Sequence, residues 1–154
     1  MWLNRRNIVV VLFRVVVVAV WSSWDSSERT ILALLRDGEQ AVETEDIARA
    51  MSHVSQQYLD DNGLNYLAVR RVLDWAFNRF DGFDVRLRDV AIDVGDGSAI
   101  ARGVLQMLVL QEGDNTYLIG DAGMPESVTI SLLKGPLGWN VTGLDGIDVS
   151  PFGL

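Results

Sequence analysis

The stretch "NYLAVRRVLDWAFNRFDGFDVRLRDVAIDV", from Asn65 to Val94, contains the change in hydrophobic period that decides the fold of this chain. In its first half, apolar residues recur at i, i+3, i+4, i+7, i+8 and i+11: Val69, Val72, Leu73, Ala76, Phe77 and Phe80. This spacing predicts an amphipathic helix that starts near Asn65 and ends at Asp81-Gly82. From Phe83 onward, apolar and charged residues alternate, which predicts a strand.

The predicted strand changes parity in its middle. Its apolar residues fall on odd positions from Phe83 to Leu87 and on even positions from Val90 to Val94. A β-bulge near Arg88-Asp89 would return both sets of side chains to the same buried face of a sheet. We therefore expect a long strand that bends at this point.

Two shorter amphipathic patterns precede this stretch. A first helix is predicted from Glu28 to about Val42, and a second, short helix carries apolar residues from Ile47 to Val54 with Thr44 as its cap. Turn signals then separate four further predicted strands: Ala99 to Gln111, Tyr117 to Gly120, Val128 to Leu132 and Trp139 to about Ile147. Helices followed by antiparallel strands predict an α+β fold, with three N-terminal helices packed on one face of the sheet.

The composition fits one acidic domain. The 154 residues include 13 Lys plus Arg, 21 Asp plus Glu and no Cys, which gives a net charge of −8. An acidic surface repels phosphate backbones, so nucleic-acid binding is not expected. The sequence has no nucleotide-binding loop and no metal-ligand spacing, and we expect neither a cofactor nor a metal. We place the domain at residues 27–150, after an N-terminal segment of residues 1–26 and before a tail of residues 151–154.

The N-terminal segment contains an apolar run, residues 8–21, which follows two arginines and is interrupted only by Arg14. As a helix it would rise roughly 21 Å, short of the roughly 30 Å hydrocarbon core of a bilayer. We expect an uncleaved membrane anchor or a signal-like segment; a buried strand and a start codon upstream of the true one are the alternatives. An anchor would place the acidic domain outside the cytoplasm of a bacterium, and cleavage would release it as a secreted protein.

Two short patterns stand out in this layout: Y-x-D-x-x-G before the third helix, at Tyr58, Asp60 and Gly63, and W-x-V-x-x-L, which starts at Trp139. Together with the order of helices and strands, they resemble the nuclear transport factor 2-like superfamily. The resemblance covers roughly Glu28 to Asp148 and is greatest to bacterial members of unassigned function. It implies a cone in which a curved antiparallel sheet wraps around the long helix, with a pocket in its mouth.

The resemblance also implies where site residues would lie. Enzymes of this superfamily place Asp, His or Tyr inside an apolar cone, and the candidates here are His53, Tyr58 and Asp121. A structural explanation competes with each: a hydrogen-bonded surface His, a Tyr whose hydroxyl binds backbone, and a solvated loop carboxylate. As a base, His53 would need Asp60 or Asp61 as its partner. The expected pocket lining is Tyr58, Trp75, Phe77, Phe80, Leu105, Met107 and Trp139.

Three functions follow from these observations. The leading hypothesis is a non-catalytic domain, tethered to a membrane, that binds a small apolar molecule or a protein partner. The alternative is a small-molecule isomerase, dehydratase or cyclase with an acid–base site in the cone. A homodimer through the sheet face that includes Val104 to Leu110 is a third possibility.

Overall fold

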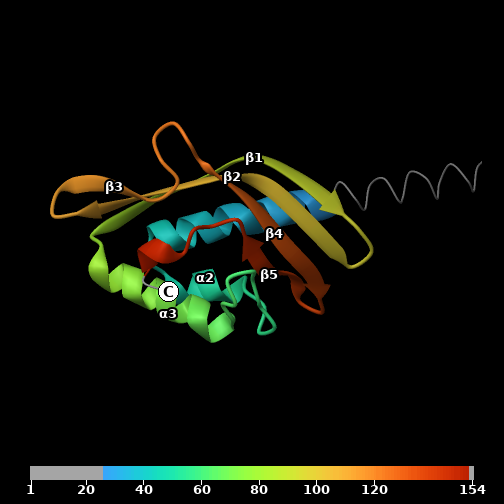
Figure 1. Cartoon of the computed structure of the whole chain (residues 1–154). Coiled ribbons are helices and arrows are strands. Elements are labelled where there is room, and N and C mark those ends of the chain that lie inside the picture. Colours follow the sequence, from blue (N-terminus) through green and yellow to red (C-terminus); the bar gives the residue numbers. More distant parts are fainter. Residues whose placement is uncertain (1–25, 153–154) are drawn as a thin grey trace, which may run out of the picture.

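The computed structural model describes residues 26–152, which form three helices and one antiparallel sheet of five strands (Figure 1). Residues 26–43 are helical and are followed by α2 (Ile47–Ser52) and α3 (Tyr66–Arg79). The strands are β1 (Gly82–Val94), β2 (Ser98–Gln111), β3 (Asp114–Ile119), β4 (Glu126–Gly135) and β5 (Gly138–Asp145). A short 3-10 helix, Ser150–Phe152, follows the last strand. The α+β prediction and its three helices are confirmed.

The helix ends follow local capping chemistry. The Asn65 side chain accepts a hydrogen bond from the Ala68 N–H and so starts α3 at the predicted residue. The predicted cap of α2, Thr44, is wrong: Asp46 caps this helix by accepting from the Arg49 N–H. The Thr44 hydroxyl instead donates to the Gln40 carbonyl, 2.8 Å away, at the end of the preceding helix. Thr44 therefore ends one helix, and the next helix starts only after the intervening turn.

The sheet has the order β1-β2-β4-β5, with β3 paired to β2 beyond the end of β4. The predicted bulge in β1 is confirmed, because the β1–β2 register shifts between Arg88 and Ala91 and Asp89 has a φ of 53°. Gly103 on β2 faces the bulge, and a Cβ at this position would lie 2.8 Å from the Arg88 carbonyl oxygen. A residue with no side chain therefore allows the two backbones to approach where the sheet bends.

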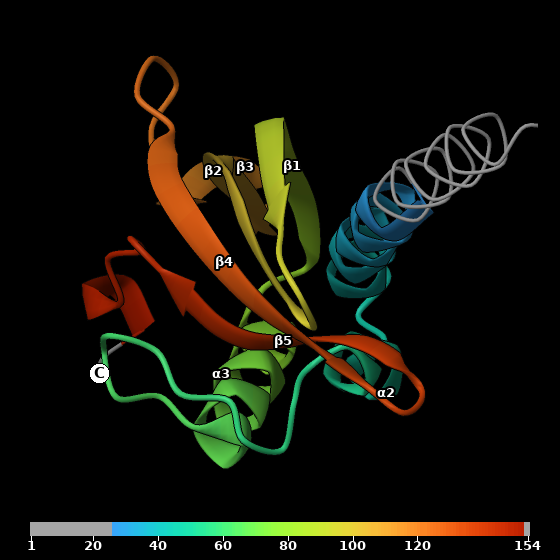
Figure 2. The ribbon, with the colours of Figure 1, turned by 90° about the vertical axis from the view of Figure 1, so that its right-hand side faces the viewer.

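The first helix runs along the free edge of β1, opposite the side on which β2 pairs (Figure 2). Glu39 accepts a hydrogen bond from the Leu87 N–H at 2.6 Å, and Glu43, one turn later, accepts from the Val85 N–H at 3.0 Å. Backbone N–H groups on a free strand edge would otherwise need water or another strand as acceptor. Two carboxylates thus fix the helix to the sheet.

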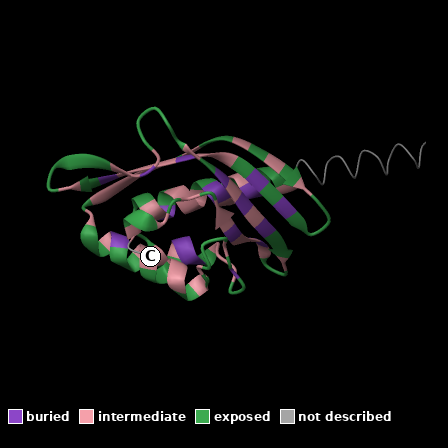
Figure 3. Cartoon of the chain, viewed as in Figure 1, coloured by how far each residue is buried: buried purple, intermediate pink, exposed green. Residues whose placement is uncertain are grey.

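Buried residues lie on the sheet and on the helices (Figure 3). Many of them belong to two groups, and the partly buried Leu87 and Leu144 pack against both. One group contains Ile31, Ala101, Leu132 and Trp139, and the other contains Leu105, Ile119 and Val128. The apolar stripe of α3 contributes only Ala76 to the fully buried set. Val69, Val72, Leu73 and Phe77 are half-buried because they line a cavity, whereas the half-buried Phe80 packs against Trp75.

The stretch Val104 to Leu110 does not form a uniform exposed surface. Leu105 and Val109 are buried on the concave side of the sheet, whereas Leu110, like Ile100, is 36% exposed. Alternation along the strand explains this division. The homodimer prediction therefore concerns the alternate residues of β2 alone, and it stays a prediction.

Within residues 26–152, no helix is long and apolar enough to cross a membrane. The apolar run of residues 8–21, on which the anchor and signal predictions rest, lies outside the described residues.

Candidate functional site

A cavity lies between α3, the first helix and the concave face of the sheet. It has a larger compartment of about 250 Å³ and a smaller one of about 150 Å³. The two compartments share six lining residues: Val42, Tyr58, Val69, Leu73, Met107 and Leu144. Polar or titratable side chains are few in both walls, so this is a mainly apolar site of the kind that binds small molecules.

Four of the seven expected pocket residues line the cavity: Tyr58 and Met107 in both compartments, Phe77 in the smaller and Leu105 in the larger. The remaining three do not. Trp75 and Phe80 pack edge to face with each other, with ring centroids 5.8 Å apart, and Trp139 belongs to the core group around Ile31. Trp75 directly precedes Ala76, which lies in the apolar stripe. Successive residues of a helix are rotated by about 100° around its axis, so the Trp75 side chain points away from the cavity.

The C-terminal residues close the smaller compartment. Ile147, Val149 and Phe152 line it, and the Phe152 ring packs edge to face against Trp75 with centroids 5.9 Å apart. The 3-10 helix that carries Phe152 therefore lies over α3 (Figure 1).

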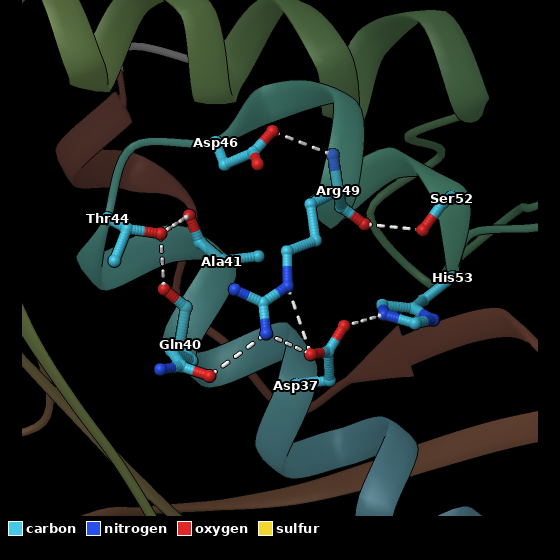
Figure 4. Close-up of polar contacts among 8 residues, drawn as sticks. All are labelled: Asp37, Gln40, Ala41, Thr44, Asp46, Arg49, Ser52 and His53. Atoms are coloured by element: carbon cyan, nitrogen blue, oxygen red, sulfur yellow. Dashed lines mark hydrogen bonds and ion pairs between the residues drawn. The ribbon is translucent and has the colours of Figure 1, made fainter.

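His53 lines the larger compartment, and its Nε2 contacts the Asp37 carboxylate at 2.5 Å (Figure 4). The expected partners, Asp60 and Asp61, are wrong. His53 follows directly after α2, and α2 folds back along the first helix, which brings the ring to a carboxylate sixteen residues earlier. Sequence spacing alone does not reveal such a contact, because it depends on how the two helices cross.

The Asp37 carboxylate also accepts hydrogen bonds from the Arg49 guanidinium, whose Nη2 donates in addition to the Gln40 side chain at 2.9 Å. The hydrogen bonds from Arg49, and next those from His53, lower the pKa of Asp37 from 3.8 to about 2. Asp37 is therefore ionised at neutral pH, and the proton shared with His53 lies on Nε2. In the neutral ring, Nδ1 is then the hydrogen-bond acceptor.

This contact makes the stability depend on pH in the acid range. Because the folded-state pKa of Asp37 lies below its usual value, the stabilisation is fully present above about pH 4 and is lost as the pH falls through about 2. We expect Asp37→Asn to be less stable than the unmodified chain at neutral pH, with a difference that shrinks between pH 4 and pH 2. Urea unfolding at several pH values measures it, with Asp121→Asn as the control. A difference that stays constant over this range would contradict the assignment.

Tyr58 is buried, and its hydroxyl donates to the Asp60 carboxylate at 3.1 Å. The phenol also has the expected backbone hydrogen bond, with Leu144. Burial, and then the charge of Asp60, raise the pKa of the Tyr58 phenol above its usual range. The other Asp60 oxygen accepts from the Asn62 and Leu64 N–H groups, and Gly63 has a φ of 77°. The Y-x-D-x-x-G pattern is thus a turn whose carboxylate holds a phenol in the cavity wall.

Glu39, like Asp37, is a residue of the site that the sequence did not predict. It lines the larger compartment while its Oε1 accepts from the Leu87 N–H, and burial raises the pKa of its carboxyl. Its position in the sequence could have indicated this place in the cavity wall. Glu39 lies beside Gly38 and three residues before Val42, and both of these belong to the apolar stripe of the first helix. A carboxylate so close to a buried stripe must either reach solvent or find a partner.

Asp121, the third catalytic candidate, does not lie in the cavity wall. It is exposed in the turn between β3 and β4, where its N–H donates to the Met124 carbonyl and its carboxylate accepts from the Ala122 N–H. Among residues 26–152, no three His, Asp or Glu side chains are grouped as metal ligands.

The fold has many similar solved structures. A protein from Novosphingobium aromaticivorans, named for a proposed role as an aromatic-ring hydroxylase, has a TM-score of 0.67 at 15% identity over 82% of this chain and 96% of its own. A second protein from that organism, a nuclear transport factor 2-like protein with a cystatin-like fold, has a TM-score of 0.66 at 13% identity, over 82% of this chain and 84% of its own. A nuclear transport factor 2-like protein from Streptomyces avermitilis, named as a proposed dehydratase, has a TM-score of 0.65 at 13% identity, over 78% and 94%.

No protein-family model and no curated protein sequence matches the chain. The similar structures share its cone of a curved antiparallel sheet closed by helices, and at 13–15% identity this likeness concerns the fold. The chain therefore has the nuclear transport factor 2-like fold that Tyr58, Gly63 and Trp139 indicated in its sequence.

Proposed function

We propose that this domain binds a small, mainly apolar molecule inside the cone. One observation carries the proposal: the apolar stripe of α3 faces a cavity of which the larger compartment alone has about 250 Å³. A cavity of this size with mainly apolar walls is typical of sites that bind small molecules. A ligand inside it would add contacts and burial to the side chains around it.

A titration with a neutral fluorescent probe tests the proposal. N-phenyl-1-naphthylamine carries no charge, so the acidic surface of the domain does not repel it. We expect a saturable rise in fluorescence with one probe per chain and a rise in melting temperature, because a ligand that binds only the folded state stabilises it. A linear, non-saturating signal without a shift in melting temperature would refute the proposal.

A second candidate is acid–base catalysis on such a ligand. It is favoured by the two side chains, His53 and Tyr58, that line one compartment, and by Asp37, which orients the His53 ring. One of the similar structures is named as a proposed dehydratase, and acid–base chemistry of this kind can remove water from a molecule. His53 would act as the base, and the Tyr58 hydroxyl, which already donates to Asp60, would position the substrate.

Loss of water from a β-hydroxy ketone such as 3-hydroxy-1-tetralone tests this second candidate. The base removes the proton next to the carbonyl, the hydroxyl leaves as water, and the product is fluorescent 1-naphthol. We expect faster release of 1-naphthol with the unmodified chain than with His53→Phe. Equal rates with both proteins, at matched probe affinity, would leave ligand binding as the function.

The membrane tether is a separate proposal that rests on residues 8–21. These residues would hold the acidic domain at the outer side of a bacterial membrane, or would direct its secretion if cleaved. Fractionation of the full-length chain from its own host tests this. The proposal requires the intact chain in the membrane fraction, or a shortened one outside the cytoplasm, and an intact chain in the soluble fraction would refute it.

A further inference from the structure

In the described part of the chain, three polar side chains line the larger compartment: Glu39, His53 and Tyr58. The Tyr58 hydroxyl donates to Asp60, and the proton on His53 Nε2 is directed to Asp37. Glu39, as a carboxylate, has no donor. With His53 neutral and Glu39 ionised, no side chain among residues 26–152 has a free hydrogen to donate to a ligand in this compartment.

The backbone of the adjacent strand edge offers none either. The two N–H groups of β1 that face the first helix belong to Leu87 and Val85, and Glu39 and Glu43 accept from them. The N–H groups within the helices are used in their own hydrogen-bonding pattern. The compartment therefore offers few hydrogen-bond donors to a ligand.

Acceptors, in contrast, remain. Only Oε1 of Glu39 accepts a hydrogen bond from the described residues, which leaves Oε2 available. Only Nε2 of His53 contacts Asp37, and Nδ1 of the neutral ring is an acceptor. Among residues 26–152, no Lys or Arg lines the compartment, and Arg36, whose charge acts on Glu39, lies outside the lining; a ligand anion would therefore meet the Glu39 charge inside the cavity.

We infer that the ligand of the larger compartment is an uncharged, mainly apolar molecule that donates a hydrogen bond, as an alcohol or a phenol does. Ketones, ethers and esters of the same shape only accept hydrogen bonds and would leave their oxygen unpaired in this compartment. Carboxylates of the same shape would bury a charge beside Glu39. The inference rests on the proposed binding function and adds the chemical class of the ligand.

Three naphthalenes of matched shape test the inference: 2-naphthol, 2-methoxynaphthalene and 2-naphthoate. Each competes with N-phenyl-1-naphthylamine for the unmodified chain. We expect 2-naphthol to bind about tenfold more tightly than the methyl ether, which corresponds to one hydrogen bond to a polar partner. We expect no competition from 2-naphthoate. A methyl ether as strong as the naphthol, or competition by the carboxylate, would overturn the inference.

Two variants identify the acceptor. Glu39→Gln keeps an oxygen for the Leu87 N–H and adds an amide donor to the cavity, so the preference for naphthol over its ether should shrink several-fold. Glu43→Gln is the matched control: it makes the same kind of contact to β1 but does not line the cavity, and the preference should stay unchanged. An unchanged preference in both variants would assign the acceptor to His53 and contradict the role of Glu39. If the fluorescent probe itself fails to bind, the proposed function falls instead.

Discussion

Replacement of Val69 by phenylalanine is expected to remove probe binding without loss of stability. Val69 lies in the α3 stripe and lines both compartments, so a larger ring at this position fills space where the two meet. Apolar side chains that fill a cavity recover packing contacts and commonly stabilise a protein by about 0.5–2 kcal/mol. We expect probe affinity to fall more than about tenfold, or about 1.4 kcal/mol, while the urea midpoint stays equal or rises.

Leu67→Phe is the matched control for this experiment. Leu67 lies on the same helix, is 59% exposed and does not line the cavity, so the same new side chain enters solvent instead. Probe affinity should match that of the unmodified chain. Equal loss of affinity in both variants would locate the binding elsewhere on α3, and unchanged affinity in Val69→Phe would show that the probe avoids the cavity.

Replacement of Gly146 by alanine is expected to be the most destabilising single-methyl change in the described part of the chain. Gly146 has a φ of 93°, and a Cβ at this position would lie 2.3 Å from the Ser127 carbonyl oxygen. The left-handed conformation alone costs roughly 1–2 kcal/mol for a residue with a Cβ. The contact with backbone adds to this cost, and we expect a total loss of about 2–4 kcal/mol in the free energy of unfolding.

Gly113→Ala separates these two costs. Gly113 has a φ of 89°, but a Cβ there would meet nothing within 4 Å. Urea unfolding should therefore show a smaller loss for Gly113→Ala, limited to the conformational cost. Gly146→Ala should in addition weaken probe binding, since the following residues Ile147, Val149 and Phe152 line the smaller compartment. Equal losses of stability in the two variants would contradict the close contact with Ser127.

The fold followed from sequence where local rules dominate. The helical stripe from Val69 to Phe77 and the parity change at Arg88-Asp89 each depend on residues close in the chain, and the structure confirms both. The Thr44 cap failed because two polar residues close together compete for one helix start. Asp46 lies directly before Ile47 and caps the helix.

The site was only partly predictable. The turn at Tyr58 and Asp60 is local, and the resemblance to the nuclear transport factor 2-like superfamily implied its place in the cavity wall. The contact of His53 with Asp37 and the position of Glu39 depend on how the first helix lies against α2 and β1, which no spacing encodes. The prediction placed Trp75 in the pocket, although the helical period places it beside the apolar stripe and not on it.

The central claim is that the ligand enters the cone, and methyl NMR of methionine tests it most directly. The chain has four methionines, of which Met107 lines both compartments and Met124 is 72% exposed in the turn between β3 and β4. We expect saturating 2-naphthol to shift the ¹³C-methyl signal of Met107 by the ring current of the bound aromatic and to leave Met124 unchanged. A shift of Met124 while Met107 stays in place would contradict binding in the cavity.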